Sequence, residues 1–346
     1  MNEKKARTMK KAILASVAMA AAAAACAQGR VQLYGLADAY VGSMRRSDQA
    51  ARATVANSNG MTTAYWGVAG TEDLGGGLKA RFALESFFQT DTGAMGRNAT
   101  DPFFSRNAWV GLEGHWGQFS VGRQTNRLFV ASGQFDPFGG SLQFSPIMLQ
   151  TWQATYNRAV LGDSVWNNSL QYASPSFGGF RVNAVYGLGE QTGNHKNNAS
   201  LTVNYASGPF AAVLAAQRVE YGPGLDGVTP AIDKQNAVLA AASYHLGVAQ
   251  VYGQIQRTRT PSLNATAHTY QLGTGVPVGP AGKIMASIAA TRREVGNASH
   301  TRRTTWAVGY DHNLSKRTDV YAIYLNDRLT GYGNAGSVGV GIRHRF

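Results

Sequence analysis

The sequence predicts an all-β fold, a 16-stranded antiparallel transmembrane β-barrel, on three observations. Apolar and polar residues alternate along most of the chain, and the segments that show this pattern are joined by short and long connections in turn. Charged residues are 15% of the 346, against roughly 25% in soluble domains. Glycine, at 41 residues, is also unusually frequent, as expected of a large sheet with many bends.

The N-terminal residues 1–27 have the pattern of a secretory signal peptide. Five basic residues precede the apolar run Ala12–Ala24, and Ala25-Cys26-Ala27 fits a small-x-small cleavage site. Residues 28–346 then form one barrel domain with 27 Lys and Arg against 18 Asp and Glu, a net charge of +9. The only cysteine leaves with the signal, so we expect no disulfide or thiol chemistry. Acylation of Cys26 is the alternative, but the alanines before it lack the leucine expected of a lipoprotein.

After Ala27 no apolar run approaches the ~20 residues that a membrane helix needs. The first strand instead places Val31, Leu33 and Val41 on one face and Gln32 and Tyr34 on the other, with Leu36 as an exception. Fifteen further segments alternate in the same way. The predicted strand cores are 30–42, 62–72, 78–90, 105–115, 117–124, 165–174, 179–188, 199–207, 209–220, 234–246, 247–259, 266–277, 282–294, 302–313, 316–328 and 336–346.

The connections predict an up-and-down barrel with a turn end and a loop end. Links such as "DLGGG" (73–77) and "GPA" (279–281) are tight turns, whereas 43–61, 91–104 and 125–164 are long. Sixteen strands enclose a lumen too wide for side chains to fill, so the polar face must line water and the apolar face must meet a membrane. Two secreted β-sandwich domains would also explain alternation, but not the missing linker or the low charge.

Six stretches, in order, resemble the Gram-negative general porins of the beta-proteobacterial type. They are "VQLYGLADA" (31–39), "GTEDLGGGLKARFALE" (70–85), "WVGLEGHWGQFSVGRQ" (109–124), "FDPFGGS" (135–141), "NNSLQYASPSFGGF" (167–180) and "VGVGIRHRF" (338–346). The resemblance implies an outer-membrane homotrimer without cofactors, in which small hydrophilic solutes and ions diffuse passively. It also implies that Phe346, the terminal aromatic residue, is the barrel-assembly signal and that the last strand closes on the first.

The family's third loop folds into the lumen and narrows it to an eyelet, and segment 125–164 corresponds to it. By this resemblance the pore constriction contains basic wall residues and acidic residues. We predict Arg123, Arg158, Arg81 and Lys79 as the basic members, and Asp136, Glu85 and Asp38 as the acidic ones. The sequence departs from the family pattern at Tyr65, Ala69 and Val165, where basic residues are expected.

The charge balance predicts a preference for anions, because opposed acids and bases in a confined passage sort ions by sign. A channel specific for a sugar or organic anion, with Tyr34, Tyr40 and Tyr65 as a solute track, is the alternative. Basic residues at the rim could also bind phosphates of lipopolysaccharide, which with outer-membrane lipid is an expected partner.

Enzymatic, metal and nucleic-acid functions find little support. The seven histidines show no metal-binding pair, and "GGGLK" (75–79) lacks the spacing of a phosphate-binding loop. We see no nucleophile with a histidine beside it, and the basic residues are spread along the chain instead of forming one stripe. We therefore expect no catalytic residues, no metal and no nucleic-acid partner.

Overall fold

A computed structural model describes residues 29–190, 196–296 and 300–346, and the predicted signal peptide lies outside these residues. The described chain is almost entirely β-structure in one antiparallel sheet. Its strands are β1 (Arg30–Met44), β2 (Ala53–Ser58), β3 (Tyr65–Gly75), β4 (Leu78–Phe87), β5 (Asn107–Gly114), β6 (Gly117–Thr125), β7 (Val165–Ala173), β8 (Phe180–Leu188), β9 (Asn197–Ser207), β10 (Phe210–Val219), β11 (Gln235–His245), β12 (Gln250–Thr260), β13 (Ala265–Val278), β14 (Gly282–Val295), β15 (Thr301–Asn313), β16 (Thr318–Leu329) and β17 (Ala335–Arg345).

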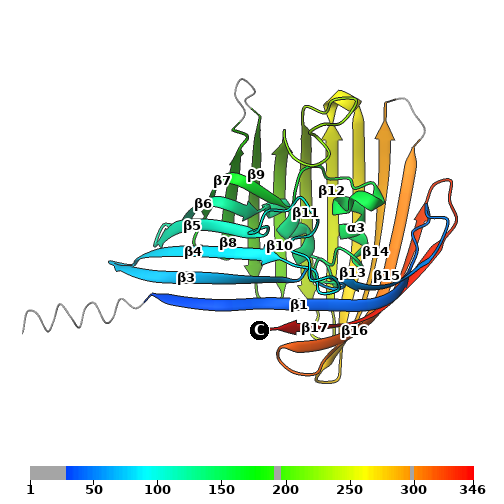
Figure 1. The fold of residues 1–346 in the computed structure, drawn as a ribbon, viewed down its shortest axis with the longest axis horizontal. Helices are drawn as coiled ribbons and strands as arrows, with labels where there is room; N and C mark the ends of the chain where they lie inside the picture. The colour runs from blue at the N-terminus through cyan, green and yellow to red at the C-terminus, as the bar shows by residue number, and fades with distance from the viewer. Residues whose placement is uncertain (1–28, 191–195, 297–299) are drawn as a thin grey trace, which may run out of the picture.

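The sheet closes on itself (Figure 1). Consecutive strands from β3 to β17 pair with their neighbours, and β17 pairs with β1 from Leu36↔Arg345 to Ser43↔Val338. The other edge of β1 pairs with β3 near the turn end and with the short β2 near the loop end. Because β2 and β3 share one edge of β1, the wall is a closed barrel of sixteen strands, as predicted. Closure gives β1 and β17, the first and last strands of the wall, a partner on each side, as a membrane requires because it cannot satisfy an open sheet edge.

The alternation has the orientation expected of a membrane barrel. On β12, Val251 and Ile255 are exposed, whereas Tyr252, Gln254 and Gln256 between and beyond them are buried. The exposed side is therefore apolar and the buried side largely polar, which is the reverse of a soluble barrel. No helix among the described residues is long and apolar enough to cross a membrane.

Two short helices and a one-turn 3₁₀ helix lie between β6 and β7. They are α2 (Arg127–Gln134), α3 (Pro146–Trp152) and η1 (Ala154–Tyr156); a second 3₁₀ turn, η2 (Pro261–Leu263), joins β12 to β13. Asn126 caps α2 by accepting a hydrogen bond from the Leu128 N–H, and Ser145 caps α3 in front of Pro146. All seven residues of α3 are buried. In Figure 1, α3 lies beside β13, β14 and β15, strands that it contacts.

Candidate functional site

The segment between β6 and β7 packs against one part of the inner wall. Buried apolar residues of α2 and α3 meet buried small and branched residues of β10, β11 and β14. The helix side chains are Leu128, Ala131, Ile147, Met148 and Trp152, and the wall side chains are Val213, Ala215, Leu239, Ala241 and Ala289. These wall residues replace the polar residues found elsewhere on the inner face, so that part of the barrel supports the segment and does not line water.

Polar contacts fix α3 to the same wall. The Gln150 Nε2 donates to the Thr305 Oγ1 at 2.8 Å and to the Ala289 carbonyl at 3.1 Å, while the Thr291 hydroxyl donates to the Gln150 Oε1 at 2.7 Å. Gln150 is 2% exposed, so each bond is made away from water. Buried hydrogen bonds of this kind specify a single position for the helix.

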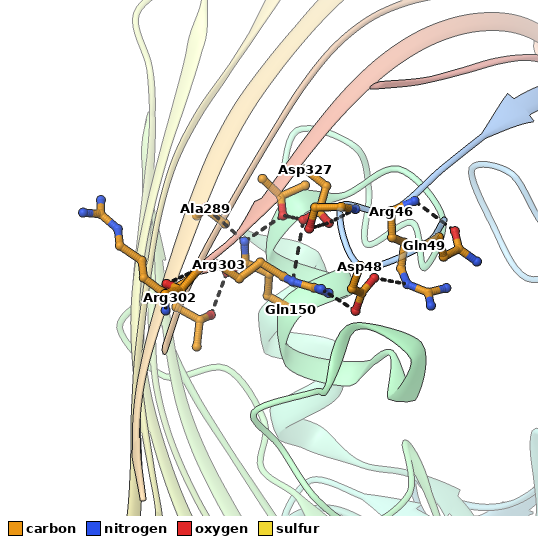
Figure 2. Close-up of polar contacts among 12 residues, drawn as sticks. Arg46, Asp48, Gln49, Gln150, Ala289, Arg302, Arg303 and Asp327 are labelled. Carbon is orange, nitrogen blue, oxygen red and sulfur yellow. Dashed lines mark hydrogen bonds and ion pairs between the residues drawn. The ribbon is translucent and has the colours of Figure 1, made fainter. Parts of the chain in front are cut away.

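A buried ionic group continues from α3 to the loop after β1 (Figure 2). Asp327 accepts hydrogen bonds from the Ser47 N–H at 3.1 Å, the Ser47 hydroxyl at 3.0 Å and the Thr305 hydroxyl at 3.0 Å. The Arg303 Nη2 donates to the Asp48 Oδ2 at 2.9 Å, and the Arg303 guanidinium lies over the Tyr156 ring at 4.8 Å. We call Ser47, Asp48, Gln150, Arg303 and Asp327 the loop anchor.

Two of the cavities inside the barrel adjoin the end of β6, and a third, of about 370 Å³, lies between α2 and the inner faces of β8 to β10. The inner cavity, at the turn end, has a volume of about 940 Å³, and the outer cavity, at the loop end, about 560 Å³. Residues 123–130 border both of them. Arg123 and Phe129 face the outer cavity, whereas Arg127 and Val130 face the inner one. The end of β6 and the start of α2 therefore stand where the two cavities meet.

The inner cavity has an excess of basic groups. Five arginines line it, against two glutamates. The arginines are Arg30, Arg81, Arg106, Arg127 and Arg181, and the glutamates are Glu85 and Glu113. Each glutamate has a partner: Arg81 donates to Glu113 at 2.5 Å, and Arg106 donates to Glu85. Among the described residues, the other three arginines have no carboxylate partner, so their charge is not neutralised locally.

The outer cavity contains three arginines and two aspartates. Arg97 takes both aspartates, because its guanidinium donates to Asp101 and to Asp163 at 2.7 Å each. Arg123 instead donates to the Ser105 carbonyl at 2.9 Å and to Asn167, and Arg158 donates to the Pro223 carbonyl at 2.6 Å. In the part of the chain that the structure describes, Arg123 and Arg158 pair with no carboxylate.

Burial and ion pairing shift the pKa of the charged groups outside the strands. Arg127 and Arg158 are partly removed from solvent, and this burial lowers the pKa of both guanidinium groups. Burial acts against the charge of Asp163 as well, but the hydrogen bonds from Arg97 outweigh it and hold the pKa of Asp163 below its usual value. The same contacts raise the pKa of Arg97 despite its burial.

The structure separates the predicted constriction residues into two groups. Glu85 and Arg81 line the inner cavity, and Arg123 and Arg158 line the outer one. Lys79 lies near the start of β4, opposite Glu113 on β5. Asp38 and Asp136 are buried, with exposed fractions of 1% and 3%.

The carboxylates of both buried aspartates accept hydrogen bonds from neighbouring groups. Asp38 accepts from the backbone N–H groups of Gly60, Met61 and Thr62 and from the Tyr321 hydroxyl, at distances of 2.6–3.0 Å. Asp136 accepts from the Gly140 N–H at 3.1 Å and from the Gln271 amide at 3.2 Å. Burial raises the pKa of Asp136 to about 7.

Phe346 lies at the seam where the barrel closes. Its backbone N–H donates to the Gly35 carbonyl at 3.0 Å and its carbonyl accepts from the Gly35 N–H at 3.1 Å. The ring lies over Gly35, where a side chain on β1 would collide with it. The inward residues of the same strand are Arg343 and Arg345, which pair with the buried Asp319 at 3.1 Å.

Sequence reasoning did not identify five of the cavity arginines. They are Arg30, Arg97, Arg106, Arg127 and Arg181. Alternation could not have placed Arg106, because Asn107 and Trp109 face the inner cavity and a two-residue period would put their neighbour on the outer face; Arg106 precedes β5, and Arg127 depends on a helix that no periodicity marks. No group of three metal-binding side chains occurs within residues 29–190, 196–296 and 300–346.

Comparison with known proteins agrees with this geometry. The sequence model described as "Gram-negative porin" matches residues 14–332. Outer membrane porin protein 32 of Delftia acidovorans is 31% identical, over 98% of this chain and 100% of that protein. The anion-selective porin from Comamonas acidovorans superposes with a TM-score of 0.76 at 27% identity, covering 92% of this chain and all of that one. A trimer form of OmpT from Vibrio cholerae shares the fold, with a TM-score of 0.69 at 18% identity over 92% and 99% of the two chains. A closed sixteen-stranded wall around internal cavities and a family match over most of the chain lead to one assignment: this chain belongs to the Gram-negative porin family.

Proposed function

We propose that this outer-membrane porin prefers anions, and that its selectivity arises where residues 123–130 separate the two cavities. As a porin, the chain is a channel and not an enzyme: small hydrophilic solutes and ions diffuse passively through its water-filled lumen. The observation that carries the proposal is the excess of arginine over carboxylate on the walls of both cavities. In a narrow aqueous passage between low-dielectric walls, fixed positive charge lowers the energy of an anion and raises that of a cation.

Arg127 is the residue on which the proposal depends most. It begins α2, where the helix dipole already makes the potential positive, and its Nε donates to the neutral Gln171 Oε1 at 3.1 Å. No carboxylate pairs with it among the described residues. We assign Arg123 and Arg158 to the outer side of the constriction, and Arg81, Glu85 and Lys79 to the inner wall.

Asp38 and Asp136 have a different role in this proposal. Their carboxylates are buried and their oxygens already accept hydrogen bonds from backbone and side-chain donors. We therefore assign them to supporting the segments that shape the constriction, and not to contact with solute.

The reversal potential of single channels in a potassium chloride gradient tests the selectivity. We expect the sign of an anion-preferring pore, and Arg127→Gln should shift the potential toward the cation value. The matched control is Arg328→Gln, which removes an outward-facing arginine from β16. A cation-selective wild type, or an unchanged potential in Arg127→Gln, would contradict the proposal.

A solute-specific channel is the second candidate. Tyr34 and Tyr65 form an edge-to-face pair at 6.2 Å, and the Arg106 guanidinium lies over the Tyr65 ring at 4.1 Å beside the inner cavity. Tyr40, the third member of the predicted track, is buried against Phe144. Saturable block of the ion current by a sugar or an organic anion would favour this candidate, whereas current that stays proportional to salt favours general diffusion.

Assembly and processing complete the proposal. We propose a homotrimer embedded in outer-membrane lipid, which the trimer form of the structural relative supports at the level of fold. We also propose that residues 1–27 are removed as a signal peptide. Light scattering of the detergent-solubilised protein measures the first, and the intact mass of protein from outer membranes measures the second. A monomer, or a mass that includes residues 1–27, would contradict them.

A further inference from the structure

The outer cavity has an aromatic wall that a preference for small anions does not use. Phe129 on α2 and Trp152 on α3 both line it, and their rings pack edge to face at 5.1 Å with 86° between their planes. Trp152 is 6% exposed and belongs to the buried cluster that joins the two helices to the wall. It supports Phe129, the more exposed of the two rings, at the edge of the cavity. Leu142, Pro102 and Pro223 add apolar surface.

Two guanidinium groups with available donors lie around the same cavity. Arg123 donates to its protein partners through Nε and Nη1, and Arg158 donates through Nη2. A guanidinium has five N–H donors. Within the described residues, the Nη2 of Arg123 and the Nε and Nη1 of Arg158 make no hydrogen bond. Both side chains therefore keep donors for an anion, and neither is neutralised by a carboxylate of its own.

The protein holds Arg158 in position before any ligand arrives. The Arg293 Nη2 on β14 donates to the Asn157 carbonyl at 2.6 Å and to the Arg158 carbonyl at 2.7 Å. The Arg158 side chain is itself fixed by its bond of 2.6 Å to the Pro223 carbonyl. Groups that are already placed lose little conformational freedom when a ligand binds. The backbone and the side chain of this arginine are thus preorganised.

The charge of the outer cavity selects a singly charged ligand. Its charged residues are three arginines and two aspartates, a net charge of +1, and Arg97 pairs with both aspartates. One carboxylate group neutralises that charge. A dianion would bring a second negative charge close to Asp101 and Asp163, where like charges repel. The charge count favours a monoanion.

The size and the lining of the cavity favour an organic acid over an inorganic ion. Its volume of about 560 Å³ lies within the range of about 300–1,000 Å³ that is typical of small-molecule sites. Such sites combine apolar and aromatic walls with a few polar groups that fix the orientation of the ligand. Chloride gains nothing from the Phe129 ring, whereas a flat aromatic ligand gains an aromatic contact there.

We propose that the outer cavity is a binding site for planar aromatic monocarboxylates. Arg123 and Arg158 bind the carboxylate through charge-assisted hydrogen bonds, and Phe129 contacts the ring. The inference rests on the proposed function only in placing this site on the path of solutes, because binding itself needs no ion flow. The site lies across residues 123–130 from Tyr34, which lines the inner cavity, so it is separate from a track of tyrosines.

Isothermal titration calorimetry of the detergent-solubilised protein at low salt tests this site, with 2-naphthoate as the probe and the same detergent in both solutions. We expect saturable binding of 2-naphthoate to wild type. The uncharged 2-naphthalenemethanol and the saturated acid decahydronaphthalene-2-carboxylate should each bind at least ~5-fold more weakly, because the first lacks the carboxylate and the second lacks the aromatic ring. This comparison uses wild type alone, so it does not depend on how well any variant folds.

Two variants test the assigned residues. We expect Arg123→Gln/Arg158→Gln to weaken binding of 2-naphthoate by at least ~10-fold, and Phe129→Leu to weaken it by about 3- to 10-fold. The matched controls are Arg317→Gln/Arg328→Gln, which removes two charges from exposed positions near the ends of β16, and Phe177→Leu, at an exposed turn. Both controls should bind like wild type. The mobility of unheated samples on electrophoresis shows whether each variant is folded.

Three outcomes would overturn the inference. Either comparison ligand could bind as tightly as 2-naphthoate, the folded site variants could bind as tightly as wild type, or the controls could lose as much affinity as the site variants. The calorimeter reports binding without ion flow, so its result is independent of the reversal potential. A failure here leaves the anion preference standing, and a cation-selective wild type leaves this site standing.

Discussion

Replacing Asp327 with alanine should destabilise the barrel more than almost any other single change at a polar residue. Asp327 is fully buried, accepts three hydrogen bonds from Ser47 and Thr305, and lies 3.7 Å from the Arg303 Nε. Arg303 is itself 4% exposed, and its Nε and Nη1 make no hydrogen bond to any residue that the structure describes. Removing the carboxylate leaves a buried guanidinium with Asp48 as its remaining counter-charge, which costs about 3–5 kcal/mol.

The measurement is equilibrium unfolding in urea, followed by tryptophan fluorescence and by the mobility of unheated samples on electrophoresis. Asp327→Asn keeps the volume and one oxygen, so we expect a smaller loss of about 1–2 kcal/mol. Adding Arg303→Met to Asp327→Ala should restore part of the stability, because it removes the buried guanidinium that has lost one of its two counter-charges. The control is Asp73→Ala, at an exposed turn where the carboxylate accepts a single bond from the Gly75 N–H at 2.9 Å.

An Asp327→Ala variant that unfolds at the same urea concentration as Asp73→Ala would refute the stabilising role of the Asp327 carboxylate. The two residues do not act as a pair if the double variant loses as much unfolding free energy as the two single variants together, or more. Single-channel current is a second readout. Ser47 and Thr305 both donate to Asp327, and Thr305 in turn accepts from Gln150 on α3. Loss of the carboxylate should loosen these contacts, so we expect noisier currents from the variant.

Three further changes test other parts of the structure. Gly35→Val places a branched side chain where the Phe346 ring lies, so we expect less folded protein in outer membranes, and equal yield would contradict the role of this seam. Burial raises the pKa of Asp136 to about 7, so the stability that its neutral carboxyl contributes is fully present below about pH 4 and is lost as pH rises from about 4 to about 7; the free energy of unfolding of wild type should fall by up to ~4 kcal/mol over that range, and that of Asp136→Asn should not. Asp163→Asn removes one of the two carboxylates that pair with Arg97 in the outer cavity and leaves Asp101 as the other, which should move the reversal potential further toward the anion value; no shift would place this ion pair outside the ion path.

The sequence was sufficient for the wall of the barrel because each strand carries its own two-residue period. The predicted core 234–246 corresponds to β11, Gln235–His245, and 282–294 to β14, Gly282–Val295. The short β2 was not predicted. It lies inside a segment assigned to a long loop, and it is defined by pairing with the end of β1, which is a tertiary contact and not a local pattern.

The helices and the constriction were harder to predict for a related reason. Helices of seven and eight residues are barely stable alone, so α2 and α3 depend on their caps and on burial against the wall. Arg127 acquires its place from α2, and the buried state of Asp38 follows from donors that lie more than twenty residues away in the chain. A residue type and its neighbours in sequence do not contain that information.

The packing of α2 and α3 against β10, β11 and β14 makes the conduit eccentric. On the proposed ion path, solute travels along the half of the barrel built from the first strands, and the opposite half supports α2 and α3. For protein engineering, this asymmetry separates the wall that lines the cavities from the wall that supports α2 and α3. Substitutions intended to change permeability should be made on β4 to β6 and at the start of α2. Substitutions intended to raise thermal stability should be made on the supporting wall, where we expect ion conductance to stay unchanged.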